Sequence, residues 1–201
     1  MNTITTILTT TANFSDDGTK RYFLRKTWDA KKPKLTIIML APAEAAGVEL
    51  DTTTQLVLNN AARLGYGSIT ITNLFATLND TALQMAEPED PENLDAIVQA
   101  AQEADTIIYA AGVGKSKSKV FQERQEQVLG ALLPYASKLN CLCNADGKAR
   151  LQHPLAPAVR TWYLSPLKLS ELIKEPVKDD AESEQKKKSK EKPLADTSPK
   201  S

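Results

Sequence analysis

The sequence has a single histidine, two cysteines, no net charge and no long apolar run, and each shortage excludes a class of protein. A structural zinc site needs four ligands, and one histidine with two cysteines cannot supply them. The 25 basic residues are balanced by 25 acidic ones, whereas a protein that grips a long stretch of duplex nucleic acid carries a basic excess. No apolar stretch approaches the roughly 20 residues of a membrane span, and the threonine-rich start does not have the pattern of a signal peptide. We therefore expect a soluble, cytoplasmic protein without a metal or cofactor.

The 201 residues divide by composition into three parts. A hydrophobic share of 41% is enough for one core. From Pro176 onward the chain is almost entirely Lys, Glu, Asp, Ser and Pro, which cannot bury enough apolar surface to offset the entropy of ordering. We predict an N-terminal extension over residues 1–19, a single α/β domain over 20–170 and a disordered charged tail over 171–201, through which a protein partner could bind.

Strands and helices are expected to alternate along the domain. Lys20–Trp28 suggests a first strand, possibly at a sheet edge, and the apolar run Leu35–Leu40 is typical of a strand covered on both faces. The other expected elements are a helix over Thr52–Leu64, a strand over Ser68–Asn73, a helix over Pro91–Ala104, a strand over Asp105–Ala111, a helix over Val120–Ala136 and a last strand over Lys138–Cys143. This order predicts a three-layer α/β/α sandwich with a central, mostly parallel sheet.

The polar signals of the sequence follow the expected strands, where ligands bind in parallel sheets. Pro42 lies on the loop after the first buried strand. Asn73, at the end of the next strand, offers a donor and an acceptor, the pair needed to read an amide-like ligand edge; the alternative is a turn or capping residue. Phe75 would stack on a planar ligand or pack in the core.

His153 stands in a loop with prolines at positions 154 and 157, which stiffen the backbone. Its unperturbed pKa lies near neutrality, so the ring can donate a hydrogen bond or a proton. We consider two alternatives: a turn histidine without a function, and a binding or anion-stabilising group at the ends of the strands.

The loop after the third strand contains Gly114-Lys115-Ser116, the end of a P-loop pattern. That pattern needs its first glycine five residues before Gly114, and the residue there is Tyr109, so a P-loop is not expected. The amides of Gly112 and Gly114 together with Lys115 could still hold a phosphate or another anion. The alternative is a solvated lysine loop.

Five short motifs stand in a recognisable order over about residues 20–165. They are Arg21-Tyr22-x-Leu24-x-x-x-Trp28, Leu40-x-Pro42, Gly65-Tyr66-Gly67, Asn73-Leu74-Phe75-Ala76 and His153-Pro154-Leu155. Together they resemble the bacterial domain-of-unknown-function family 1643, which has no established activity to carry over. That family usually has Leu-Asn-Pro-Ser-Thr-Ala where this chain has Leu40-Ala41-Pro42-Ala43-Glu44-Ala45, so the chain resembles a divergent member.

A more distant similarity is to the uracil-DNA glycosylase superfamily. Those enzymes have a proline-containing loop after the first strand, an asparagine at the end of the next strand and a histidine-proline loop near the end of the fold. The resemblance implies a similar fold, with Asn73 reading the edge of a flipped base and His153 stabilising the departing base anion. Their water-positioning residue lies one or two residues before the loop proline. Ala41 and Leu40 stand there in this chain, so the resemblance does not carry the catalysis over.

Three functions remain open on the sequence. The first is binding of a nucleobase, nucleotide or nucleic-acid end, with His153 as the one candidate catalytic group. The candidate binding residues are Pro42, Asn73, Phe75, Gly112, Gly114, Lys115 and His153. The second is a non-enzymatic interaction protein with a decayed pocket, and the third is a nucleotide-processing enzyme with a degenerate phosphate loop.

Overall fold

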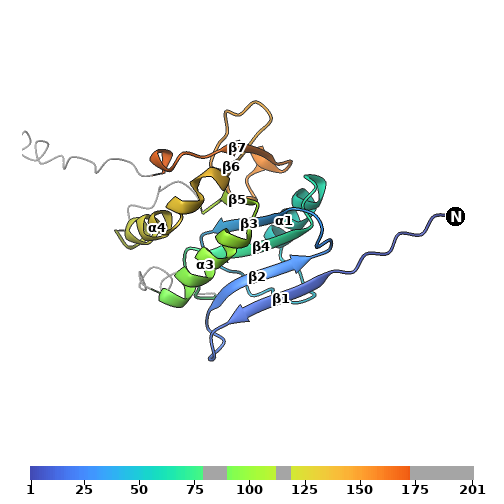
Figure 1. The fold of residues 1–201 in the computed structure, drawn as a ribbon, viewed down its shortest axis with the longest axis horizontal. Helices are drawn as coiled ribbons and strands as arrows, with labels where there is room; N and C mark the ends of the chain where they lie inside the picture. Colours follow the sequence, from blue (N-terminus) through green and yellow to red (C-terminus); the bar gives the residue numbers. More distant parts are fainter. Residues whose placement is uncertain (79–89, 112–118, 173–201) are drawn as a thin grey trace, which may run out of the picture.

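The computed structural model describes residues 1–78, 90–111 and 119–172. These residues form a seven-stranded sheet in the order β1-β2-β4-β3-β5-β6-β7, with helices on both faces (Figure 1). The strands are β1 (Thr9–Phe14), β2 (Arg21–Thr27), β3 (Lys34–Met39), β4 (Ser68–Asn73), β5 (Thr106–Tyr109), β6 (Leu139–Cys143) and β7 (Tyr163–Pro166). The helices are α1 (Thr52–Arg63), α3 (Pro91–Glu103) and α4 (Lys119–Ala131), with the 3-10 turns η1 (Leu133–Lys138), η2 (Pro157–Val159) and η3 (Leu169–Glu171).

The expected α/β class is confirmed, but the sheet is mixed rather than mostly parallel. The central strands β4, β3, β5 and β6 pair in parallel. Antiparallel ladders add β2 and β1 beyond β4, and β7 beyond β6. Only residues 15–20 join β1 to β2, and so short a connection permits only antiparallel pairing.

The two outermost strands were not predicted. Thr9–Phe14, placed in the N-terminal extension, forms the edge strand β1, so β2 is not at the edge. Lys138–Cys143 is not the last strand, because β7 follows it. Both edge strands are mostly exposed or half-buried. A strand that buries so few side chains needs no alternation of apolar and polar residues. That alternation is the pattern from which strands are predicted.

The inner elements match their predicted positions closely. Strand β4 has the predicted bounds, and α1 begins after Asp51, whose side chain accepts a hydrogen bond from Thr54 N at 2.9 Å. Helix α3 begins at Pro91, as predicted. The helix expected over Val120–Ala136 ends at Ala131, because Pro134 has no N–H to continue the helical ladder and the chain tightens into η1.

The sheet separates two cores. Helices α3 and α4 cover one side, here called the α3/α4 face, and α1 covers the other, the α1 face (Figure 1). Ile38 packs on the α3/α4 face and its neighbour Ile37 on the α1 face, as the alternation of a strand requires. A side chain's position along a strand therefore decides which core it enters.

The four parallel strands finish at a common edge of the sheet, here called the rim. Met39 pairs with Asn73 there, and β5 and β6 end beside them at Tyr109 and Cys143. The loops after β3 and β4, which carry Pro42 and Phe75, leave from this rim, which makes it the place to look for a binding site.

Candidate functional site

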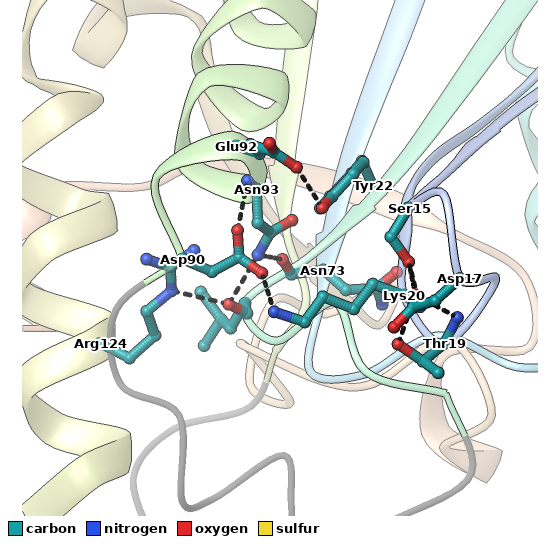
Figure 2. Close-up of polar contacts among 11 residues, drawn as sticks. Ser15, Asp17, Thr19, Lys20, Tyr22, Asn73, Asp90, Glu92, Asn93 and Arg124 are labelled. Carbon is teal, nitrogen blue, oxygen red and sulfur yellow. Dashed lines mark hydrogen bonds and ion pairs between the residues drawn. The ribbon is translucent and has the colours of Figure 1, made fainter.

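Asn73 is the last residue of β4 and is 1% exposed. Ile69 and Ile71 belong to the α1-face core, so alternation directs the Asn73 side chain to the same face. Its backbone carbonyl accepts a hydrogen bond from Asn93 Nδ2 at 3.1 Å (Figure 2). Within the described part of the chain, neither the Nδ2 nor the Oδ1 atom of its own amide has a hydrogen-bond partner. The amide therefore makes no capping or turn hydrogen bond, and its donor and acceptor are both unused.

Arg21 lies near Asn73 on the neighbouring strand β2. In that ladder Leu24 pairs with Ile71, so the register brings the start of β2 beside the end of β4. Arg21 Nη1 donates to the carbonyls of Ala43 and Ala45 at 2.8 and 3.0 Å, while its Nε has no partner. Burial lowers the pKa of the Arg21 guanidinium. The loop after β3 is thus anchored on a buried cation.

The start of β2 contains a bulge. Because of it, Arg21 and Tyr22 each point to the face opposite to the one that regular alternation would give. Asn13 pairs with Phe23 but Phe14 pairs with Arg21, so Tyr22 is the extra residue of the ladder. A bulge of this kind reverses the side-chain alternation on one side of it. Tyr22 consequently reaches Glu92 at the start of α3.

The loop after β3 has no acidic side chain next to its buried proline, Pro42. Ala41 is half-buried and Leu40 is 39% exposed. Asp51, at the far end of the loop, is engaged in capping α1 and also accepts from Thr54 Oγ1 at 2.6 Å. A hollow of about 510 Å³ opens along residues 43–51. The loop can admit a ligand, but it offers no carboxylate beside Pro42 to activate water.

His153 lies at the rim near the end of β5. Gln152 N donates to Leu142 O at 3.5 Å and Arg150 bridges Cys143 in antiparallel fashion, so residues 150–152 run back along β6. Because β7 occupies the other side of β6, this segment lies on the β5 side, past Tyr109. His153 therefore lies beyond the end of β5, and Asn73 ends β4, with β3 between these two strands.

The His153 ring is half-buried, and this burial lowers its pKa. Its Nδ1 accepts a hydrogen bond from Leu155 N at 3.2 Å, which assigns the proton of the neutral ring to Nε2. A neutral imidazole at neutral pH can therefore donate one hydrogen bond from Nε2 to a ligand at the rim.

Phe75 is 4% exposed and packs in the α3/α4-face core. Its backbone N–H donates to Leu40 O at 3.1 Å, which joins the ends of β4 and β3. Of the two alternatives for the Phe75 ring, stacking on a ligand or packing in the core, the structure shows packing in the core. Gly112, Gly114 and Lys115 lie outside the described residues.

Sequence reasoning missed a second group of buried polar side chains, on the α3/α4 face. They are Thr72, Asn93, Tyr109, Arg124 and Gln125, and each carries at least one polar atom without a hydrogen-bond partner. Arg124 stands three residues after Phe121 and four before Val128, both of which are core residues of α4. A charged residue on the apolar stripe of a helix was the available signal.

Charged and hydrogen-bonded pairs lie at the start of α3, beside this group (Figure 2). Lys20 pairs with Asp90 at 3.1 Å. Tyr22 Oη donates to Glu92 in a short hydrogen bond, which, with smaller effects of burial and nearby charge, raises the pKa of Tyr22 to about 12. These contacts fix the first turn of α3 to the start of β2.

Within residues 1–78, 90–111 and 119–172, no three His, Cys, Asp or Glu side chains gather into a group that could hold a metal ion. In the same ranges, no helix is long and apolar enough to cross a membrane.

The family model described as "Protein of unknown function (DUF1643)" matches residues 21–155, which is more than half of the chain. The match begins at Arg21 and ends at Leu155, so it contains Asn73 and His153. Searches of curated proteins and of solved structures found no match. The similarity to uracil-DNA glycosylases therefore stays a prediction.

Proposed function

The chain belongs to the DUF1643 family, and we propose that it binds a nucleobase, nucleotide or nucleic-acid end at the rim, with the Asn73 amide reading the edge of the base. One observation carries the proposal: Asn73 is 1% exposed and both its donor and its acceptor are unpartnered. A buried polar group without a partner costs about 1–3 kcal/mol. A ligand that supplies both partners recovers this cost.

The chemistry of the amide favours a base as the ligand. Nucleobases present an N–H group next to a carbonyl or a ring nitrogen on one edge, and an asparagine amide pairs with such an edge through two hydrogen bonds. A site with buried polar groups also rejects compounds that cannot satisfy them. His153 offers an Nε2 donor for a more distant oxygen of the same ligand.

The proposal is for binding without catalysis. Leu40 and Ala41 precede Pro42, and Asp51 is occupied as the cap of α1. Because Asn73 is covered, a base reaches it only if the loop over residues 40–51 shifts. That loop includes Val48, which is 99% exposed, and Leu50, which is 38% exposed. Part of the loop therefore makes few packing contacts with the rest of the protein.

The test is a thermal-shift and calorimetric screen of nucleobases, nucleosides, 5′-monophosphates and short single-stranded DNA against the full chain. A ligand at 100 times its Kd should stabilise the wild type by about 2.7 kcal/mol. Asn73→Leu, which removes both amide groups at similar volume, should abolish the shift. Asn13→Leu is the matched control, because Asn13 is an exposed asparagine on the edge strand β1.

The stability of the ligand-free variant separates a ligand site from a structural amide. Asn73→Leu should be as stable as the wild type or more stable, since it removes two unpartnered groups. No shift with any compound would overturn the proposal and favour an interaction protein with a decayed pocket. Turnover of a bound nucleotide, detected by chromatography, would instead favour the nucleotide-processing alternative.

A further inference from the structure

The five buried polar side chains on the α3/α4 face form a cluster whose floor is the sheet. Ile38 pairs with Thr72 on one side and with Tyr109 on the other, so the three side chains form a row across β4, β3 and β5. Ile38 belongs to the α3/α4-face core, which directs the hydroxyls of Thr72 and Tyr109 to that face. Both residues are at most 1% exposed, and neither hydroxyl has a hydrogen-bond partner.

Side chains from two helices cover this floor. Asn93 Nδ2 of α3 and Arg124 Nε of α4 donate to the same carbonyl oxygen, that of Leu74, at 3.0 and 2.8 Å. Gln125 lies close enough to act on the Tyr109 hydroxyl, although the two make no regular hydrogen bond. Asn93 Oδ1, Arg124 Nη2 and Gln125 Nε2 are unpartnered. The strand residues and the two helices therefore place these unpartnered polar atoms on the same face of the sheet.

The guanidinium of Arg124 lacks a counter-ion among the described residues. It is 1% exposed, and its Nη1 donates to the neutral Gln127 Oε1 at 2.5 Å. Asp90 acts on it only from a distance and is itself paired with Lys20. A buried charge without a partner is strongly unfavourable, so an anion at Nη2 would relieve the folded protein of that cost.

The unused atoms also indicate which anion fits. Arg124 Nη2 and Gln125 Nε2 are donors, and the hydroxyls of Tyr109 and Thr72 can donate, so the cluster is rich in donors. Asn93 Oδ1 is an acceptor and needs a proton from the ligand. Hydrogen phosphate carries several acceptor oxygens and one P–OH proton, whereas sulfate carries no proton at neutral pH.

We propose that a phosphate group binds within the buried polar cluster under α3 and α4, through Arg124 Nη2 and Gln125 Nε2, with the P–OH donating to Asn93 Oδ1. This site lies on the opposite face of the sheet from the Asn73 side chain. It does not depend on the nucleobase proposal, and either can fail alone.

The test measures the melting temperature of the full chain with inorganic phosphate, methyl phosphate, sulfate or acetate, at ionic strength matched with sodium chloride. Inorganic phosphate at 100 times its Kd should raise Tm by about 5 °C, with a smaller effect of sulfate and acetate. A shift of equal size with methyl phosphate identifies a phosphate monoester as the ligand, and a smaller one identifies free phosphate.

Two variants and a control locate the effect. Arg124→Met should abolish the phosphate shift, while Arg25→Met, which breaks the half-buried pair of Arg25 with Glu103, should keep it. If Arg124→Met does not fold, Gln125→Leu tests whether phosphate binds at this cluster. It removes an unpartnered amide, so Tm without phosphate should be unchanged or higher, while the affinity for phosphate should fall about fivefold. A phosphate effect no larger than that of sodium chloride, or one unchanged in Gln125→Leu, would overturn the proposal.

Discussion

Asn93 and Arg124, from two different helices, donate to one oxygen atom, the carbonyl of Leu74. Asn93 also donates to Asn73 O at 3.1 Å. The carbonyls of Asn73 and Leu74, at the end of β4, thereby accept hydrogen bonds from side chains of α3 and α4. This arrangement holds both helices at the rim and makes Asn93 a structural element of the site.

We expect Asn93→Ala to lower the free energy of unfolding by about 3 kcal/mol, because it removes two buried hydrogen bonds and leaves a carbonyl unsatisfied. Urea unfolding followed by circular dichroism measures this loss. Asn13→Ala, on the exposed edge strand, should change stability by less than about 0.5 kcal/mol. A loss below about 1 kcal/mol in Asn93→Ala would show that water replaces the amide.

Tyr22 should produce a pH dependence at high pH. Its pKa is raised from 10.0 to about 12, mainly by the hydrogen bond to Glu92, so the folded state holds the phenol proton more tightly than the unfolded chain. The stability from this contact is complete below pH 10 and is lost as the pH rises through 12. Denaturant unfolding at several pH values should therefore show a shallower decline in Tyr22→Phe than in the wild type. Equal declines would contradict the link between Tyr22 and Glu92.

His153 should titrate below its unperturbed value of 6.5, because burial disfavours the charged ring. Since the folded pKa is lowered, His153 supports stability above pH 6.5, and this contribution is lost as the pH falls through the folded pKa. The chain has one histidine, so its ring protons can be followed by NMR without assignment. The urea-unfolded chain supplies the reference. A folded midpoint at or above the unfolded one would mean that the ring is solvated or paired with an anion.

Gly67 should not tolerate a side chain. A Cβ at this position would lie 1.9 Å from Asp29 O and 2.7 Å from Lys32 Cβ. We expect Gly67→Ala to destabilise the protein by about 2 kcal/mol or more, as measured by thermal unfolding. Gly130 provides the contrast, because it lies in α4 with open space around it, and Gly130→Ala should stabilise by about 0.5–1 kcal/mol.

The sequence predicted elements whose signals are local. The apolar run Leu35–Leu40 corresponds to β3, because a strand buried on both faces favours apolar side chains. Ser68–Asn73 corresponds to β4, where the alternating Ile69 and Ile71 share one face. Pro91 indicated the start of α3. The edge strands β1 and β7 were not predicted, because partly exposed strands do not require apolar side chains at regular positions.

The site was predictable only in outline. Asn73 and His153 were placed at strand ends, and the structure puts both at the rim. The bulge at Tyr22 was not predictable, since the residue that β2 leaves unpaired depends on its register with β1. That Arg124 lacks a counter-ion was not predictable for a related reason. The distance from its guanidinium to a carboxylate depends on how α4 packs, not on the neighbours of Arg124 in the chain.

By itself, the sequence determined the α/β class of the fold and the positions of its inner strands and helices, because periodicity and capping act over a few residues. Only the tertiary structure decided which polar side chains lose water and which of those find a partner. Asn73 and Arg124 illustrate this difference, since both are polar residues in regular elements. Burial and the lack of a partner arise from segments far apart in the chain, and these two properties make both residues candidates for binding.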